Sequence, residues 1–122
     1  MNRVVHFEIP AAKPDRAVKF YEKTFGWKVQ KAPGEMDYWL LTTGTDKEPG
    51  VNGAIMSNVG TIKQIVNTID VKSLGETSKK VLAAGGKRVS PDQTIPGVGH
   101  FAYFIDTEGN PFGLMQNDPT AK

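Results

Sequence analysis

Residues 5–29, VHFEIPAAKPDRAVKFYEKTFGWKV, return 60 positions later as residues 65–89, IVNTIDVKSLGETSKKVLAAGGKRV. The two stretches align without a gap, and each reads as a short apolar strand, a helix, a glycine and a second strand. A repeat that occurs only twice indicates two matching modules and not a solenoid. Modules this small must pack or pair to bury a core, and the groove between them is the natural place for a ligand.

Composition limits the classes of protein to which the chain can belong. It has 122 residues, of which 39% are hydrophobic and 23% charged, a net charge of +2 and no cysteine. The small charge argues against nucleic acid as a partner, and the lack of cysteine excludes disulfides and thiolate metal sites. No signal peptide opens the sequence and no apolar run is long enough to cross a membrane. We therefore expect a cytoplasmic protein with no membrane partner.

Apolar periodicity and turn residues predict the order βαβββ twice, which is an α+β pattern. The first repeat covers about 1–58, with strands expected at 4–9, 27–32, 37–43 and 53–57 and a helix from Pro14 to a glycine stop at Gly26. The second repeat covers about 64–117, with strands at 64–70, 86–90, 100–105 and 112–116, a helix capped by Ser73 and a loop at 91–99. A turn at Pro33-Gly34 and a linker at 58–63 complete a single domain over 1–122.

Alternation along the strands and helical spacing predict which side chains are buried. In the first strand, His6 and Glu8 share the face that points away from the following helix, and Pro10 should end the strand. The buried stripe expected on the first helix is Ala17, Phe20, Tyr21, Thr24 and Phe25. The residues expected to face the core from the second helix are Leu74, Val81 and Leu82.

Two longer stretches resemble a known family. HFEIPAAKPDRAVKFYEKTFGW at 6–27 and AYFIDTEGNPFGLMQ at 102–116 are similar to the most recognisable segments of the vicinal oxygen chelate superfamily, which contains glyoxalase I, bleomycin-resistance proteins and extradiol dioxygenases. The resemblance covers nearly the whole chain. It implies paired βαβββ modules that form an open cup-shaped mixed sheet with helices outside. It also implies that a protein this small forms a homodimer.

The resemblance also implies where the ligands of a metal ion would lie. Metal-using members carry four ligands, and His6 matches the first of them by its spacing from Arg16-Ala17. The other three positions fall near Gly53, on Val66 and on Gly113, none of which is a ligand. One histidine holds a divalent ion weakly. We therefore expect no cofactor, and both a divalent metal and glyoxalase I activity are disfavoured.

His6 and Glu8 remain as candidate catalytic residues. A carboxylate beside an imidazole can orient it and support general acid–base chemistry without metal, although a histidine and a glutamate satisfied by hydrogen bonds would show the same pattern. Aromatic, methionine and histidine side chains predicted near the cleft could bind a flat organic ligand. These candidate substrate-binding residues are Trp39, Met56, His100, Tyr103 and Met115.

Two functions stay open. The first is a glyoxalase/bleomycin-resistance-like protein that lacks most metal ligands and binds a small organic molecule in the cleft of the cup. The alternative is an enzyme, a glyoxalase-like lyase or isomerase that acts on a small hydroxy-carbonyl or glutathione-derived substrate through His6 and Glu8. The sequence does not decide between them.

Overall fold

The structure, a computed structural model, describes residues 1–33, 37–58 and 62–122. The chain divides into two compact units, 6–65, here called the first module, and 1–5 with 66–122, the second module. Gly34 of the predicted turn and residues 59–61 of the predicted linker lie outside the described residues. That the two repeats form one domain stays a prediction.

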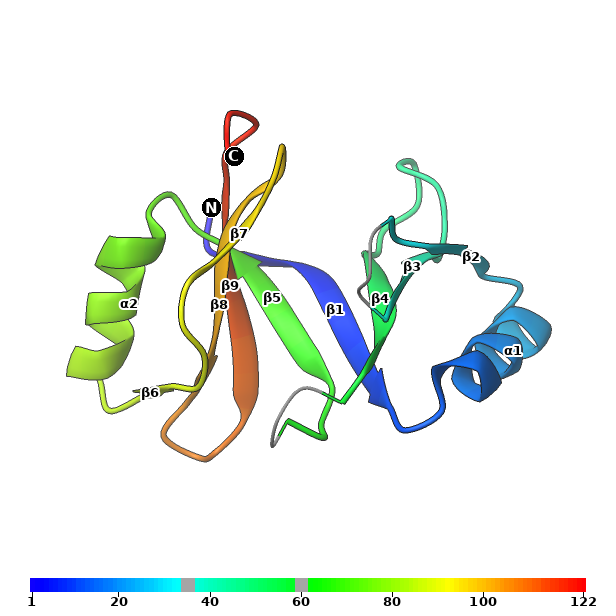
Figure 1. Ribbon diagram of the computed structural model, residues 1–122, viewed down its shortest axis with the longest axis horizontal. Coiled ribbons are helices and arrows are strands. Elements are labelled where there is room, and N and C mark those ends of the chain that lie inside the picture. Colours follow the sequence, from blue (N-terminus) through cyan, green and yellow to red (C-terminus); the bar gives the residue numbers. More distant parts are fainter. Residues whose placement is uncertain (34–36, 59–61) are drawn as a thin grey trace. The chain divides into compact units, whose positions relative to one another are not determined.

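The described residues of the first module form one helix and one mixed sheet (Figure 1). Its elements are β1 (Arg3–Ala11), α1 (Pro14–Phe25), β2 (Lys28–Lys31), β3 (Tyr38–Thr42) and β4 (Asn52–Ser57), and β1 begins in the second module. The strand order is β2-β3-β4-β1. The pairs β2–β3 and β3–β4 are antiparallel, whereas β4–β1 is parallel. β1, the first strand of the module, therefore pairs with β4, the last strand.

The second module repeats this order with one interruption. Its elements are β5 (Val66–Asp70), α2 (Leu74–Ala83), β6 (Lys87–Arg88), β7 (Gln93–Ile95), β8 (Gly99–Ile105) and β9 (Pro111–Asn117). The order is β5-β9-β8-β6, and β7 also pairs with β8. The α+β class with paired modules is confirmed. The prediction that 91–99 is only a loop is wrong, because β7 pairs with β8 through Gln93, Thr94 and Ile95.

The helix ends follow the predicted signals. α1 begins at Pro14, after an N-cap Lys13 whose side chain makes no capping hydrogen bond, and ends at Gly26, where φ is 73°. Glycine adopts this left-handed conformation without the steric cost of a Cβ. At α2, the Ser73 hydroxyl accepts a hydrogen bond of 3.1 Å from the Glu76 backbone N–H. Three helix ends, at Pro14, Gly26 and Ser73, are therefore marked by residues visible in the sequence.

Three expectations about burial and strand ends are wrong. No residue of α1 is buried, and Phe20 and Phe25 are 57% and 58% exposed. The ring of Tyr21 stacks on Trp27 at 5.1 Å, and Trp27 in turn contacts Phe7, so an aromatic cluster links α1 to β1. Leu82 of α2 is 52% exposed.

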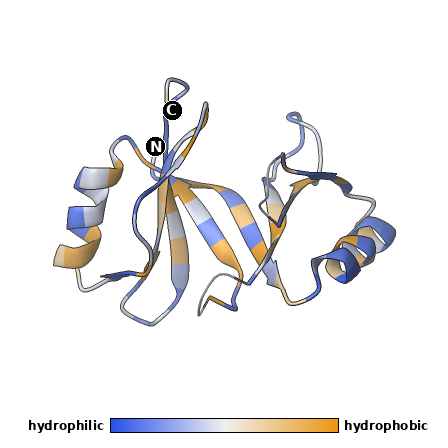
Figure 2. Cartoon of the chain, viewed as in Figure 1, coloured by the Kyte–Doolittle hydropathy of each residue, from blue (hydrophilic) through white to orange (hydrophobic). Residues whose placement is uncertain are grey.

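Pro10 does not end β1, which continues to Ala11. Proline lacks an N–H donor, but its fixed φ is compatible with extended backbone. Pro10 accordingly lies in the parallel ladder opposite Met56. Polar and apolar residues alternate along β1 and β5, as the change between blue and orange in Figure 2 shows.

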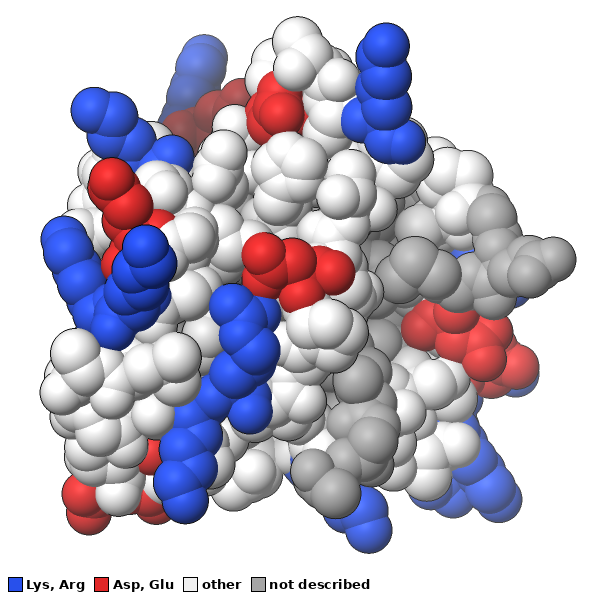
Figure 3. All heavy atoms as spheres, turned by 60° about the vertical axis from the view of Figure 1, so that its left-hand side comes forward, with Lys and Arg blue, Asp and Glu red and all other residues white. Residues whose placement is uncertain are grey.

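The core of the second module lies between its sheet and α2. Val71, Leu74, Ala102, Phe104 and Leu114 form one buried cluster, against which Ile69, Val81 and Phe112 pack. No helix among the described residues is long and apolar enough to cross a membrane. On the face drawn in Figure 3, Lys and Arg side chains stand among acidic and uncharged ones.

Candidate functional site

Three polar side chains of the first module form one hydrogen-bonded chain. The Tyr38 hydroxyl lies 2.7 Å from His6 Nε2 and donates a hydrogen bond of 2.7 Å to Glu8 Oε2. The His6 and Tyr38 rings are nearly parallel, with an interplanar angle of 13°. Glu8 is only 4% exposed, whereas His6 and Tyr38 are half-buried. The chain therefore runs from a buried carboxylate towards a more accessible imidazole.

The strand register brings these residues together. β4 lies between β1 and β3, with Ala54 opposite both Glu8 and Leu40, and Met56 opposite both Pro10 and Tyr38. Paired residues of neighbouring strands point to the same face of a sheet. His6, Glu8 and Tyr38 thus share one face. Phe7 points to the other face, towards Trp27 and α1, as its position in the alternation predicts.

Burial changes the protonation of His6. It lowers the pKa of His6 below the ordinary 6.5, and the negative charge of Glu8 raises it by a smaller amount. At neutral pH the imidazole is therefore uncharged and has one donor and one acceptor nitrogen. A neutral imidazole is the form that accepts a proton as a general base.

This lowered pKa predicts how stability depends on pH. In the unfolded chain His6 binds a proton near pH 6.5, whereas in the folded chain it binds a proton only at lower pH. The free energy of unfolding therefore falls as pH falls from 6.5 through the folded pKa. Urea unfolding of the natural protein and of His6→Gln across this range should show that the free energy of unfolding falls more steeply with falling pH in the natural protein. Equal slopes would contradict the lowered pKa.

The structure distributes the other candidate substrate-binding residues over different faces. Met56 shares the face of His6 and Glu8. Trp39 lies on the opposite face, where Lys31 Nζ is 5.5 Å from the centre of its ring. In the second module, Tyr103 and Met115 share the face of β8 and β9 that points away from the core cluster. Their roles in substrate binding stay predictions.

His100 has both ring nitrogens engaged within the second module. Nδ1 lies 3.2 Å from the Thr94 hydroxyl and Nε2 lies 3.0 Å from Asp118 Oδ2. The Thr120 hydroxyl and His100 hold the pKa of Asp118 below its usual range. These contacts join β8 to β7 and to the segment after β9, so a structural role accounts for His100.

The metal positions implied by the resemblance do not form a site among the described residues. Within 1–33, 37–58 and 62–122, no three His, Cys, Asp or Glu residues gather closely enough to hold a metal ion. A Cβ at Gly53 would lie 2.5 Å from the Phe7 carbonyl oxygen, so no side chain fits there. The described donors therefore do not fit the metal of this superfamily, and the expected absence of a cofactor stays a prediction.

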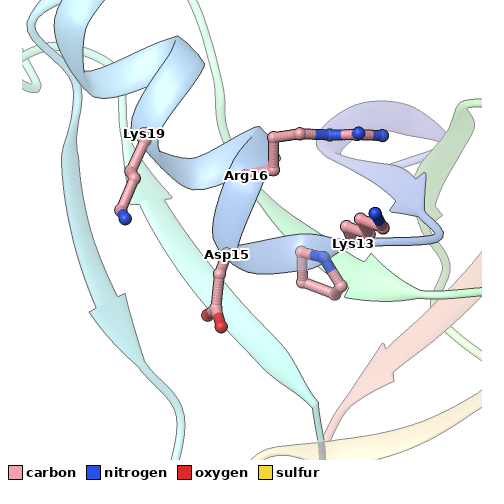
Figure 4. A pocket seen from close by; sticks show the side chains of 5 residues that line it. Lys13, Asp15, Arg16 and Lys19 are labelled. Carbon is pink, nitrogen blue, oxygen red and sulfur yellow. The ribbon is translucent and has the colours of Figure 1, made fainter.

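A depression of about 450 Å³ lies elsewhere, at the start of α1, lined by Lys13, Pro14, Asp15, Arg16 and Lys19. Figure 4 shows the Arg16 and Lys19 side chains extending to opposite sides of the helix. Their charges do not converge on one point. The hydrogen-bonded chain of His6, Tyr38 and Glu8 is therefore the better candidate site.

Comparison with known proteins places the chain in a family. A glyoxylase-like domain-containing protein of Didymella fabae is 37% identical over 115 residues, which cover 89% of each chain. The family described as bleomycin resistance protein-like N-terminal matches residues 3–44. The chain belongs to the vicinal oxygen chelate superfamily. The resemblance seen in the sequence is thereby confirmed.

Solved structures of this superfamily share the fold. Methylmalonyl-CoA epimerase from Mycobacterium tuberculosis aligns with a TM-score of 0.69 at 16% identity, over 94% of this chain and 87% of the epimerase. A Streptomyces coelicolor methylmalonyl-CoA epimerase variant in complex with 2-nitronate-propionyl-CoA gives a TM-score of 0.70 at 12% identity, over 100% and 99% of the two chains. At such identities the likeness concerns the fold alone, since one fold hosts many chemistries.

Sequence reasoning did not connect Tyr38 with His6 and Glu8. Tyr38 lies 30 positions from Glu8 and 32 from His6, and its hydroxyl meets them only because β3 and β1 flank β4. The available signal was the alternation that places Tyr38 and Trp39 on opposite faces of β3. It did not reveal which of those faces carries His6.

Proposed function

We propose that this protein binds a small organic molecule on the sheet face of the first module that carries His6, Tyr38 and Glu8. The hydrogen-bonded chain of these three residues supports the proposal most directly. Polar groups fixed in this way among apolar neighbours, here Ala54 and Met56, are typical of ligand sites. No metal is required for such binding. A homodimer in the cytoplasm remains the expected state.

A second candidate function is proton transfer on the bound molecule, as in a lyase or isomerase. The lowered pKa of His6 favours it, because a neutral imidazole is available as a base at physiological pH. Glyoxylase-like and methylmalonyl-CoA epimerase relatives suggest two probe classes, a hydroxy-carbonyl adduct of glutathione and an acyl-CoA. Binding without turnover would support the first candidate, and turnover would support the second.

His6→Ala tests both candidates. We expect this substitution to lower, by about tenfold or more, the affinity for the probe that the natural protein binds. The reason is that a buried hydrogen-bonding partner contributes on the order of 1–3 kcal/mol. Isothermal titration with S-lactoylglutathione, the methylglyoxal–glutathione hemithioacetal and methylmalonyl-CoA measures the binding, and proton exchange followed by NMR measures the turnover.

Lys19→Ala is the matched control, since Lys19 lines the depression at α1 and lies outside the three-residue chain. It should leave affinity and turnover unchanged. Unchanged affinity and turnover in His6→Ala, with the fold intact by circular dichroism, would contradict the proposed site. Stoichiometric metal in the purified protein, measured by elemental analysis, would contradict the proposal that binding requires no metal.

A further inference from the structure

The single proton of the Tyr38 hydroxyl has two neighbours at the same distance. His6 Nε2 and Glu8 Oε2 each lie 2.7 Å from the Tyr38 oxygen. A phenol has one O–H to donate, whereas its oxygen can also accept. The hydroxyl donates to the Glu8 carboxylate, which has only acceptor oxygens when ionised. Its proton is therefore not available to His6.

This arrangement determines which nitrogen of His6 carries its proton. At 2.7 Å, an unprotonated Nε2 would place its lone pair against a lone pair of the Tyr38 oxygen. The contact is favourable only when Nε2–H donates to that oxygen. The partner of one ring nitrogen thus specifies the state of the other. In neutral His6 the lone pair must lie on Nδ1.

We propose that Tyr38 is a positioning residue that holds His6 as the Nε2–H tautomer, so that Nδ1 accepts a hydrogen bond from a hydroxyl group of the ligand. This inference rests on the proposed function and names its ligand class, a neutral compound that carries a hydroxyl group. A carboxylate is disfavoured at the same place because it brings acceptors only.

The surroundings of His6 support this assignment. Among the described residues Nδ1 has no hydrogen-bond partner, whereas Nε2 has one. His6 is half-buried, so part of this residue is accessible to a ligand. The negative charge that acts on the ring comes from Glu8. That charge opposes a second anion at the imidazole and is compatible with a neutral hydroxyl.

The tautomer is measured without any ligand, in the full-length protein at neutral pH. Two-bond ¹H–¹⁵N correlation spectra distinguish a protonated nitrogen from an unprotonated one in each imidazole ring. We expect His6 to show a protonated Nε2 and an unprotonated Nδ1. The Tyr38→Phe variant removes the acceptor, and the ratio of Nε2–H to Nδ1–H should fall by about fivefold, the effect of one hydrogen bond.

His100 is the internal control, because its two ring nitrogens contact Thr94 and Asp118 and not Tyr38. Its spectrum should be unchanged by Tyr38→Phe. An Nδ1–H tautomer of His6 in the natural protein, or a His6 ratio unaffected by Tyr38→Phe, would overturn the positioning role. Neither result depends on a ligand, so the positioning role of Tyr38 can be disproved while the proposed binding function stands.

Three small probes of similar size test the ligand class. Hydroxyacetone carries the hydroxyl, 2-butanone replaces it with a methyl group, and pyruvate replaces the hydroxymethyl group with a carboxylate. The His6 Nδ1 resonance should shift on titration with hydroxyacetone and remain in place with the other two. A shift with pyruvate as large as that with hydroxyacetone would overturn the inferred class. So would the absence of a shift with hydroxyacetone at the highest concentration that leaves the fold intact.

Discussion

Replacing Phe104 with alanine should lower the free energy of unfolding by about 3–5 kcal/mol, the usual cost of removing a buried aromatic ring. Phe104 is fully buried in the cluster between the second-module sheet and α2, and it stacks on Phe112 at 5.8 Å. The cavity left by its ring would be lined by apolar groups that lose their contacts. Equilibrium unfolding in urea measures the change.

Phe20→Ala provides a matched control for this prediction. The same ring is removed, but Phe20 lies on α1 with 57% of its surface exposed. The expected loss is about 1 kcal/mol or less, because little apolar surface returns to water. Equal losses in the two variants would show that the core of the second module is not where the structure places it.

Gly53→Ala should destabilise the first module by about 1–3 kcal/mol or more, as overpacking of a close contact does. The added Cβ would lie 2.5 Å from the Phe7 carbonyl oxygen and 2.6 Å from the Phe7 ring. A backbone atom cannot rotate away, so β1 and β4 must separate. Because His6 and Glu8 flank Phe7, the NMR signals of His6 should change as well. Urea unfolding and the imidazole spectra measure the two effects.

The comparison variant for Gly53→Ala is Gly75→Ala. Gly75 lies in α2, where an added Cβ would have only the Ser73 hydroxyl within 4 Å. Alanine is a better helix former than glycine by about 1 kcal/mol, so this variant should be at least as stable as the natural protein. A Gly53→Ala protein as stable as Gly75→Ala would contradict the close packing of β1 on β4.

Local signals in the sequence predicted much of the fold. The repeat, the glycine stop at Gly26 and the alternation that separates His6 from Phe7 all depend on neighbouring residues, and the structure confirms them. Tyr38 and Trp39, as neighbours on β3, point to opposite faces, as alternation requires. The repeat itself predicted two modules that pack or pair, and the superfamily resemblance implied the same arrangement.

Features that depend on distant partners were missed. β7 is three residues long and is a strand only because β8 supplies its hydrogen bonds. Helical spacing assigned Phe20 to a buried stripe, but periodicity cannot show whether another element covers that side of α1. The hydrogen bonds of Tyr38 required the parallel pairing of β1 with β4, which brings together residues separated by more than 40 positions.

The division of β1 between the two modules has a consequence for the order of folding during synthesis. Residues 6–65 contain all of the first module, so its contacts can form before the rest of the chain emerges from the ribosome. The opening segment 1–5 belongs to the second module, and the Asn2 N–H bonds the Asp70 carbonyl oxygen at 2.7 Å. Residues 1–5 must therefore wait for residues 66–122, which are translated later, and their docking is a slow step of high contact order.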